Sequence, residues 1–200
     1  MLKNNVNGGE VSVMVDLETL GLRNEATVFQ ISAIAFDLET GEHIANYDKV
    51  ADISKNENME VDGGTLQWWL NTDAELLKTL LCDRNDGIST DDLIRDFHDW
   101  LISLSAHPNH EDLLFWGNGA LFDNVKVKLN MERVGLKYPI HYKKDRDVRT
   151  LLHLASLKSG LSEKEIKEQV DSSDIRKHDA LDDVVYQIRF ANYCYKILMG

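Results

Sequence analysis

Two acidic residues close a hydrophobic run near the start of the chain. The run VSVMVDLET, residues 11–19, alternates valines with other residues and ends in Asp16 and Glu18. Because side chains of a strand alternate between its faces, both carboxylates project from one face, about 6.6 Å apart. Acids this close repel each other unless a cation lies between them, and hard carboxylate oxygens suit Mg²⁺ or Mn²⁺. The alternative is that the strand merely ends in solvent here.

A third acid, Asp123, lies in the segment FWGNGALFDN, residues 115–124. It follows a predicted buried strand at 113–117 and stands where a helix is expected to begin, near Phe122. An aspartate in a first helical turn also interacts favourably with the helix dipole, by about 0.3–1 kcal/mol. Asp123 is therefore either a site residue or a helix-capping residue.

A third cluster is HDALDDVVYQ, residues 178–187. Its His178 and Asp183 are five residues apart, about 140° around an ideal helix, so they do not share a helix face. We expect His178 on the approach to a helix, Asp179 near the cap, and Asp183 one turn inside, beside the apolar stripe. Asp179 and Asp182 are expected to face water, whereas an acid beside the core requires a partner. A merely polar helix start is the alternative.

Together these segments predict one site. The four carboxylates of Asp16, Glu18, Asp123 and Asp183 are enough to hold two divalent ions about 3.5–4 Å apart, an arrangement used for in-line phosphodiester displacement. An imidazole titrates near neutral pH, with a reference pKa of about 6.5, so His178 is the candidate that takes a proton from the attacking water.

The elements that position these groups follow from the hydrophobic pattern. Strands are predicted at 10–15, 27–36 and 43–50, as an antiparallel meander, and a further strand at 113–117. Three leading strands, then helices alternating with short strands, describe a mixed α/β domain. We expect residues 1–9 to form a flexible tail and 10–200 a single domain. The predicted helices cover 65–72, 73–81, a segment capped at Ser89–Asp91, a segment from about 122, 148–158, 161–170 and 179–198.

Three motifs in this order, VDLETLG, WGNGALFDN and HDALDD, resemble the exonuclease motifs of the DnaQ-like branch of the DEDD superfamily. The histidine five residues before the final aspartate resembles the DEDDh type. TLQWWL at 65–70 and RDVRTLL at 146–152 further resemble phage exodeoxyribonuclease A, exonuclease VIII and ribonuclease T. The resemblance spans about residues 11–195.

This resemblance implies a ribonuclease-H-like fold, with a mixed sheet flanked by helices. It implies 3′→5′ removal of nucleoside 5′-monophosphates from single-stranded DNA ends, with two Mg²⁺ or Mn²⁺ ions. By matched position, Asp16, Glu18, Asp123 and Asp183 are the implied metal ligands and His178 the general base. All five positions agree with the family pattern.

Substrate contacts are implied at five further positions. In such enzymes the segment after the first motif cradles the terminal nucleotide, and in this chain it comprises Thr19, Leu20 and Gly21. Leu20 is the candidate wedge against the last base, and Asn118 the candidate contact to sugar or phosphate. Adjacent helix residues diverge by about 100°. We therefore expect one of Trp68 and Trp69 to pack in the core, and Trp68 to approach the substrate.

Charge and cysteine content bound the class of protein. The chain has 22 basic and 34 acidic residues, a net charge of −12, which argues against a passive nucleic-acid coat. Residues 126–149 nevertheless hold eight basic and three acidic residues, either a phosphate track or a solvated surface. Cys82 and Cys194 each lie in apolar runs, which predicts buried, reduced thiols in a cytoplasmic protein, or in the host cytoplasm for a phage-encoded one. No run approaches the roughly 18 apolar residues of a membrane span.

Other functions are compatible with the same sequence. A 3′→5′ exoribonuclease that trims RNA ends fits the same residues, and recognition of the 2′-hydroxyl distinguishes the two substrates. A non-catalytic nucleic-acid-binding subunit that retains the fold is expected to have lost an acid or the histidine, and a structural Ca²⁺ domain would have no nuclease activity. Ribonuclease-T-like relatives are often dimers, and an apolar helix face here is a candidate homodimer surface.

Overall fold

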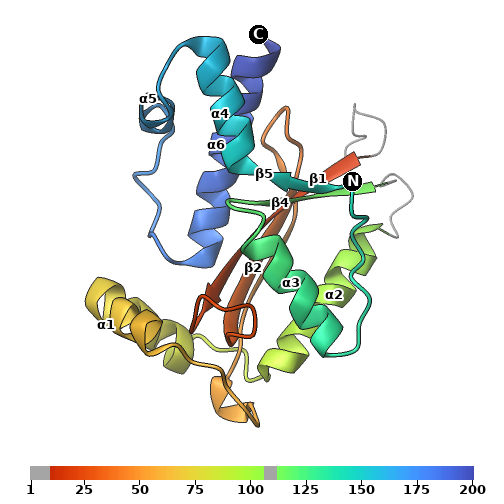
Figure 1. The fold of residues 1–200 in the computed structure, drawn as a ribbon, viewed down its shortest axis with the longest axis vertical. Coiled ribbons are helices and arrows are strands. Elements are labelled where there is room, and N and C mark those ends of the chain that lie inside the picture. The colour runs from red at the N-terminus through yellow and green to blue at the C-terminus, as the bar shows by residue number, and fades with distance from the viewer. Residues whose placement is uncertain (1–9, 106–111) are drawn as a thin grey trace.

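A computed structural model describes residues 10–105 and 112–200, so the predicted tail at 1–9 lies outside the described residues. Five strands form one sheet in the order β3-β2-β1-β4-β5, shown in Figure 1. The first three strands pair antiparallel, and β4 and β5 are added parallel to β1. The predicted mixed sheet is confirmed. The strands are β1 (Glu10–Thr19), β2 (Val28–Phe36), β3 (His43–Val50), β4 (Asp112–Gly117) and β5 (Asp145–Asp147).

Helices cover both faces of the sheet (Figure 1). On one face α2 (Thr90–Ser105) and α3 (Asp123–Arg133) pack over a core that includes Val13 of β1. On the other face α4 (Val148–Ser159) and α6 (Ala180–Met199) pack over a core that includes Met14. The alternation of β1 between the two cores is the pattern that its sequence predicts.

A third, smaller core lies under α1 (Gly63–Lys78) and the following π-helical turn η2 (Thr79–Asp83). The two helical segments predicted here are continuous except at Asp73, whose extended backbone kinks the helix and whose carboxylate caps the second part at the backbone N–H of Leu76. Cys194 is buried as predicted, but Cys82 is exposed. The π turn directs Leu80 into the core and leaves Cys82 outside.

Two short elements complete the fold and differ from the predictions. β5 was not predicted, because its three residues are all charged and it forms by pairing with the end of β4. The predicted helix at 161–170 is shortened to α5 (Glu163–Glu168). Its N-terminus is stabilised by a capping box, in which Ser162 and Glu165 each bind the other's backbone N–H. A short 3-10 turn, η1 (Ile53–Lys55), follows β3. Within the described ranges, none of the helices has the length and apolar character needed to cross a bilayer.

Candidate active site

Asp16 and Glu18 lie at the end of β1, beyond the point where β4 leaves it. The parallel pairing ends at Met14 opposite Trp116, whereas the antiparallel pairing with β2 continues past Glu18. One edge of β1 is therefore open at its carboxyl end. Both carboxylates project from the face that α6 covers, as the alternation of strand side chains requires.

Asp183 reaches the same place from the first turn of α6. Asp179 caps this helix by accepting a hydrogen bond from the backbone N–H of Leu181, and Asp183 lies one turn further on, as the sequence predicts. Carboxylate oxygens of Asp16, Glu18 and Asp183 all lie within 4.8 Å of one another. Residues separated by more than 160 positions along the chain thus meet at one end of the sheet.

Asp123 lies next to this trio, beside the end of β1. It is the first residue of α3 and is buried, and the backbone N–H of Leu17 donates to its carboxylate. Leu17 stands between Asp16 and Glu18 in the strand, so Asp123 is held beside both. It is outside the tightest group of three, but its charge acts on both acids of β1.

The electrostatics of the four acids are unfavourable without a cation. Burial, and next the neighbouring carboxylates, raise the pKa of Asp16 and of Glu18 well above the ordinary range. Burial raises the pKa of Asp123 to about 7, against hydrogen bonds and the charge of Arg149, and it also raises the pKa of Asp183. In the described part of the chain no ion pair with lysine or arginine involves these four acids. Their hard oxygens are the donor set that a divalent cation takes.

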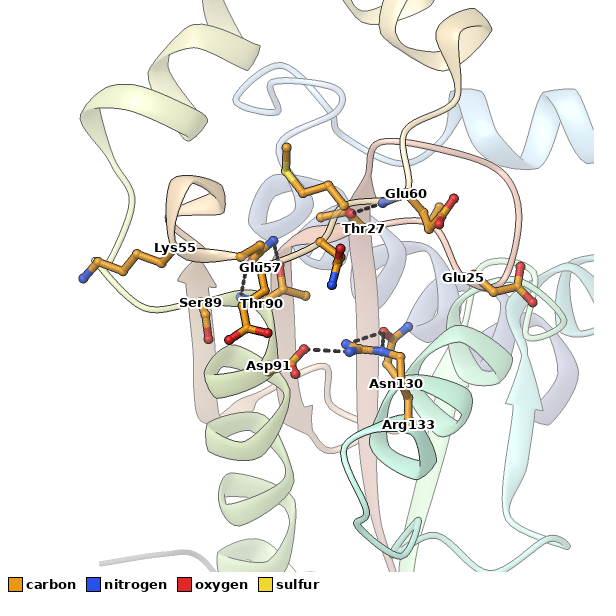
Figure 2. A pocket seen from close by; sticks show the side chains of 14 residues that line it. Glu25, Thr27, Lys55, Glu57, Glu60, Ser89, Thr90, Asp91, Asn130 and Arg133 are labelled. Atoms are coloured by element: carbon orange, nitrogen blue, oxygen red, sulfur yellow. Dashed lines mark hydrogen bonds and ion pairs between the residues drawn. The ribbon is translucent and has the colours of Figure 1, made fainter.

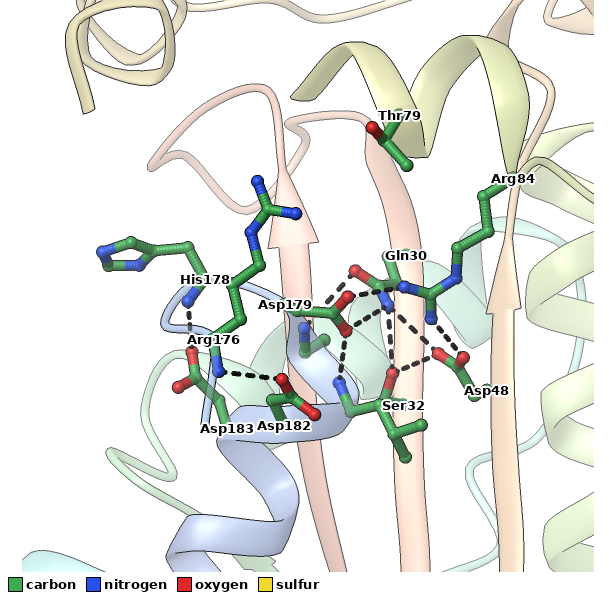
Figure 3. A network of polar contacts seen from close by, with 12 residues as sticks. Gln30, Ser32, Asp48, Thr79, Arg84, Arg176, His178, Asp179, Asp182 and Asp183 are labelled. Atoms are coloured by element: carbon green, nitrogen blue, oxygen red, sulfur yellow. Dashed lines mark hydrogen bonds and ion pairs between the residues drawn. The ribbon is translucent and has the colours of Figure 1, made fainter. Parts of the chain in front are cut away.

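His178 lies on the approach to α6, as expected, in a strained conformation. Its φ of 68° is in the left-handed region, which non-glycine residues rarely adopt. Its backbone N–H donates to Asp183 Oδ2 at 3.0 Å, while the imidazole points away from that carboxylate in Figure 3. The ring meets Trp68 edge to face, with centroids 4.9 Å apart. The histidine is thus anchored to the acid cluster through its backbone.

The two tryptophans of α1 divide as predicted. Trp69 is 1% exposed and donates its indole N–H to the backbone oxygen of Thr19 at 3.2 Å. Trp68 is 44% exposed and covers His178. One ring therefore holds the end of β1 in place, and the other presents an open face beside the candidate site.

The segment after the first motif is more enclosed than the substrate role suggests. Thr19 is buried and its hydroxyl donates to the backbone oxygen of Gly21 at 2.8 Å. Leu20 is 3% exposed and belongs to the core under α1. Gly21 is among the residues that line a cavity of about 520 Å³. The wedge role of Leu20 stays a prediction, as does the substrate contact of Asn118, which is exposed on the loop after β4.

Arg149 lies over the loop that carries Asn118. Gly119 has φ of 119°, and a side chain there would meet the guanidinium carbon of Arg149 at 3.1 Å. Glycine thus allows the guanidinium to rest on the loop, near enough to Asp123 to lower its pKa. Lys126 is a different case within the basic stretch. It is fully buried and donates to the backbone oxygens of Leu22 and Arg23, so it supports the loop after β1 and is not part of a phosphate track.

Two residues beside the site are not indicated by the sequence motifs. Gln187 donates to Asp16 Oδ1 at 2.8 Å, and its spacing of four residues from Asp183 on α6 is a signal that could have found it. Arg84, after the π turn, reaches the residue next to His178. Nothing in the local sequence around Arg84 indicates that contact. Asp179, expected to face water, is instead 9% exposed, because Arg84 pairs with it.

A second hollow of about 420 Å³, drawn in Figure 2, lies beside the loop after β1, which contributes residues 25–27 to its lining. Acids outnumber bases among its lining residues, and the guanidinium of Arg133 is paired with Asp91 at 2.7 Å. Figure 2 shows this pair joining the ends of α2 and α3. Because both basic side chains of the lining, Lys55 and Arg133, are outnumbered by acids, this hollow is not a basic track for phosphate.

Solved nucleases share the fold. The nuclease domain of 3′hExo, a DEDDh family member bound to rAMP, has a TM-score of 0.62 at 12% identity, covering 95% of this chain and 92% of that one. E. coli ExoI in a complex with ssDNA has a TM-score of 0.63 at 16% identity, and exonuclease I of Methylocaldum szegediense 0.66 at 16%. The match covers 94% and 93% of this chain, and 40% of each exonuclease I chain. No curated protein matches the chain.

The sequence family agrees with the fold. A family model described as the 3′-5′ exoribonuclease Rv2179c-like domain matches residues 11–195. The predicted DnaQ-like resemblance and the ribonuclease-H-like fold are both confirmed. The chain belongs to the Rv2179c-like domain family of 3′-5′ exonucleases.

Proposed function

We propose that this exonuclease hydrolyses the last phosphodiester bond of single-stranded RNA 3′ ends, releasing nucleoside 5′-monophosphates, with two divalent ions held by Asp16, Glu18, Asp123 and Asp183. The observation that carries the proposal is the convergence of oxygens from three of these acids within 4.8 Å, with Asp123 beside them. Buried carboxylates this close need positive charge, and two ions suit an in-line displacement at phosphorus. We take residues 10–200 as one domain, because the strands of its sheet span residues 10 to 147.

The donor set fits Mg²⁺ or Mn²⁺, since all the donors are carboxylate oxygens. Bound there, the ions would lower the pKa of a water molecule and stabilise charge on the phosphate. Gln187 holds Asp16 in one orientation through its amide. The backbone N–H of Leu17 does the same for Asp123.

His178 acts as general base in this proposal. The water proton passes to an imidazole nitrogen of His178, the water oxygen bonds to phosphorus, and the bond from phosphorus to the 3′ oxygen breaks. That oxygen takes up a proton from solvent, the monophosphate leaves, and the imidazole of His178 returns its proton to solvent. The ring must first rotate away from Trp68 toward the acids, a side-chain movement that needs no change in its anchored backbone. Catalytic contacts often tighten in this way only when substrate binds.

RNA is the leading substrate because the family description is that of exoribonucleases. Single-stranded DNA is the second candidate, because the accessory segments at 65–70 and 146–152 resemble phage exodeoxyribonuclease A and exonuclease VIII as well as ribonuclease T, and the similar solved structures include ExoI with ssDNA. Arg149 and Asn118 are the proposed phosphate and sugar contacts on the loop after β4. The chemistry at the phosphate is the same for both substrates.

The test is a time course with matched RNA and DNA oligomers labelled at the 3′ or the 5′ end, with Mn²⁺ or with EDTA. We expect label to leave the 3′ end first as a monophosphate, a ladder from the 5′ label, faster cleavage of RNA, and no cleavage in EDTA. Faster cleavage of DNA would make single-stranded DNA the preferred substrate in place of RNA. Internal cuts, or full activity in EDTA, would contradict the proposed reaction.

Metal binding is expected to stabilise the protein more at pH 8 than at pH 5. The raised pKa values mean that the metal-free fold favours protonated acids. The stability that these raised pKa values give to the metal-free fold is fully present below the ordinary carboxyl pKa, about 4. It is lost as the pH rises through about 7, the pKa of Asp123, because the buried acids then ionise. A cation offsets that loss in the upper range. At a hundred times its Kd, an ion adds about 2.7 kcal/mol, or roughly 5–10 °C in Tm.

Differential scanning fluorimetry with and without Mn²⁺ at both pH values makes this measurement. Asp123→Asn is the matched variant, and its metal-free Tm should fall less between pH 5 and pH 8. An equal shift by Mn²⁺ at the two pH values would show that these acids are not where the ion binds.

Trp68 is expected to contribute to substrate binding through its exposed ring. Base stacking on an aromatic side chain contributes about 1–3 kcal/mol, so Trp68→Leu should raise KM for a single-stranded oligomer about tenfold or more. Steady-state kinetics provide the measurement. Leu66→Ala, at another exposed position of α1, is the control and should leave KM unchanged. An unchanged KM for Trp68→Leu would show that the ring packs on His178 and does not bind substrate.

A further inference from the structure

The residue that follows His178 is the centre of a buried polar network. Asp179 is 9% exposed, and besides capping α6 it accepts hydrogen bonds from Gln30 Nε2 at 3.3 Å and from Arg84 at 2.5 Å. Figure 3 shows dashed lines from its carboxylate to both of these side chains. Gln30 also accepts from the backbone N–H of Ala180 at 3.4 Å. The start of α6 is therefore attached to β2 of the sheet at two adjacent residues, Asp179 and Ala180.

Arg84 joins this network to β3. One of its nitrogens pairs with Asp179 and the other with Asp48, whose second oxygen accepts from Ser32 at 2.6 Å. The side chains of Asp48 and Asp179 are 22% and 12% exposed, so the two acids are largely shielded from water. A planar guanidinium with several fixed donors can serve both carboxylates at once, and a lysine cannot do so with the same geometry.

The neighbouring backbone requires such a support. His178 holds φ of 68°, a conformation that persists in a non-glycine residue only where the surroundings impose it. On one side its N–H is bound by Asp183, and on the other side Asp179 is fixed by Arg84 and Gln30. A second ion pair, Arg176 with Asp73, also ties this loop to α1, but it is more exposed, and exposed pairs contribute little.

We propose that Arg84 is a positioning residue for the proposed general base. It acts through Asp179, which it ties to Asp48, and so keeps the backbone of His178 in its observed conformation, from which the proposed rotation brings the imidazole toward the acid cluster. This inference rests on the proposed role of His178. The ion pairs of Arg84 are with Asp48 and Asp179, and neither is one of the four acids of the cluster, so we expect Arg84 to alter the rate through the geometry of the base.

A double-mutant cycle tests the inference. In the otherwise wild-type protein, Arg84→Met should lower kcat about 10-fold to 100-fold, the range expected when a catalytic group is misplaced by about 1 Å. KM should change less than about twofold. In the His178→Ala background the same substitution should change kcat less than about twofold, because there is no longer a base to misplace. Arg84→Lys should recover part of the loss.

Two further variants separate positioning from general weakening. Asp179→Asn keeps a good helix cap but loses the charge that Arg84 binds, and it should reproduce the kcat loss of Arg84→Met. Lys49→Met removes a different ion pair of β3, with Asp96, and should leave kcat unchanged. If Arg84→Met fails to fold, the same double-mutant cycle is measured with Asp179→Asn and Arg84→Lys, each in the wild-type and His178→Ala backgrounds.

The outcomes are distinguishable. An equal fold-loss of kcat in both backgrounds, or a loss confined to KM, would overturn the positioning role and leave the proposed function intact. Wild-type kcat in His178→Ala itself would instead remove the general base, and the positioning role with it.

Discussion

Asp16→Asn is expected to reduce turnover with Mg²⁺ or Mn²⁺ about 10³-fold or more. Metal-ion catalysis contributes several kcal/mol, and each 1.36 kcal/mol corresponds to about a tenfold change in rate. Asparagine keeps the oxygen that accepts from Gln187, so the local fold is preserved while the charge that holds the ions is lost. Single-turnover cleavage of a labelled oligomer at saturating enzyme measures the effect.

The same substitution should also raise the metal-free Tm at pH 8. Burial and the neighbouring acids raise the pKa of Asp16, so its ionised form opposes folding in that range and its removal relieves the repulsion. Glu39→Gln removes one negative charge from an exposed turn and is the control for overall charge. Substantial residual activity in Asp16→Asn, or a lower metal-free Tm, would count against a metal site built on this acid.

His178→Ala is expected to lower kcat about 10²–10⁴-fold, the usual contribution of a general base, while Mn²⁺ still stabilises the protein. The backbone N–H of residue 178, which binds Asp183, is unaffected by the substitution. The rise of rate with pH, measured between pH 6 and 9, should flatten in the variant. His153→Ala, on the exposed face of α4, is the matched control. A wild-type rate that does not change over this pH range would exclude His178 as the base.

Much of the fold was predictable, because it depends on local patterns. The alternation through Val13 and Met14 predicted a strand with two covered faces, and both cores are found there. The three leading strands and the start of α3 at Asp123 followed from β-branched runs and a glycine-rich turn. β5 could not be predicted, because its residues lack any apolar pattern and only pairing with β4 makes it a strand.

The acid quartet was predictable, whereas its surroundings were not. Motif order located Asp16 and Asp183, and the structure brings them together. The burial of Asp179 and Lys126 depends on partners about 95 and 103 residues away, so local pattern suggested solvent exposure for both. Charged side chains are usually exposed unless paired, and pairing over such distances is a property of the fold alone.

The most direct test of the account is diffraction from crystals grown with Mn²⁺, recorded at the manganese absorption edge. Two anomalous peaks about 3.5–4 Å apart among Asp16, Glu18, Asp123 and Asp183 are the predicted result. An absence of manganese at these four acids at saturating concentration, in crystals of active enzyme, would contradict the account.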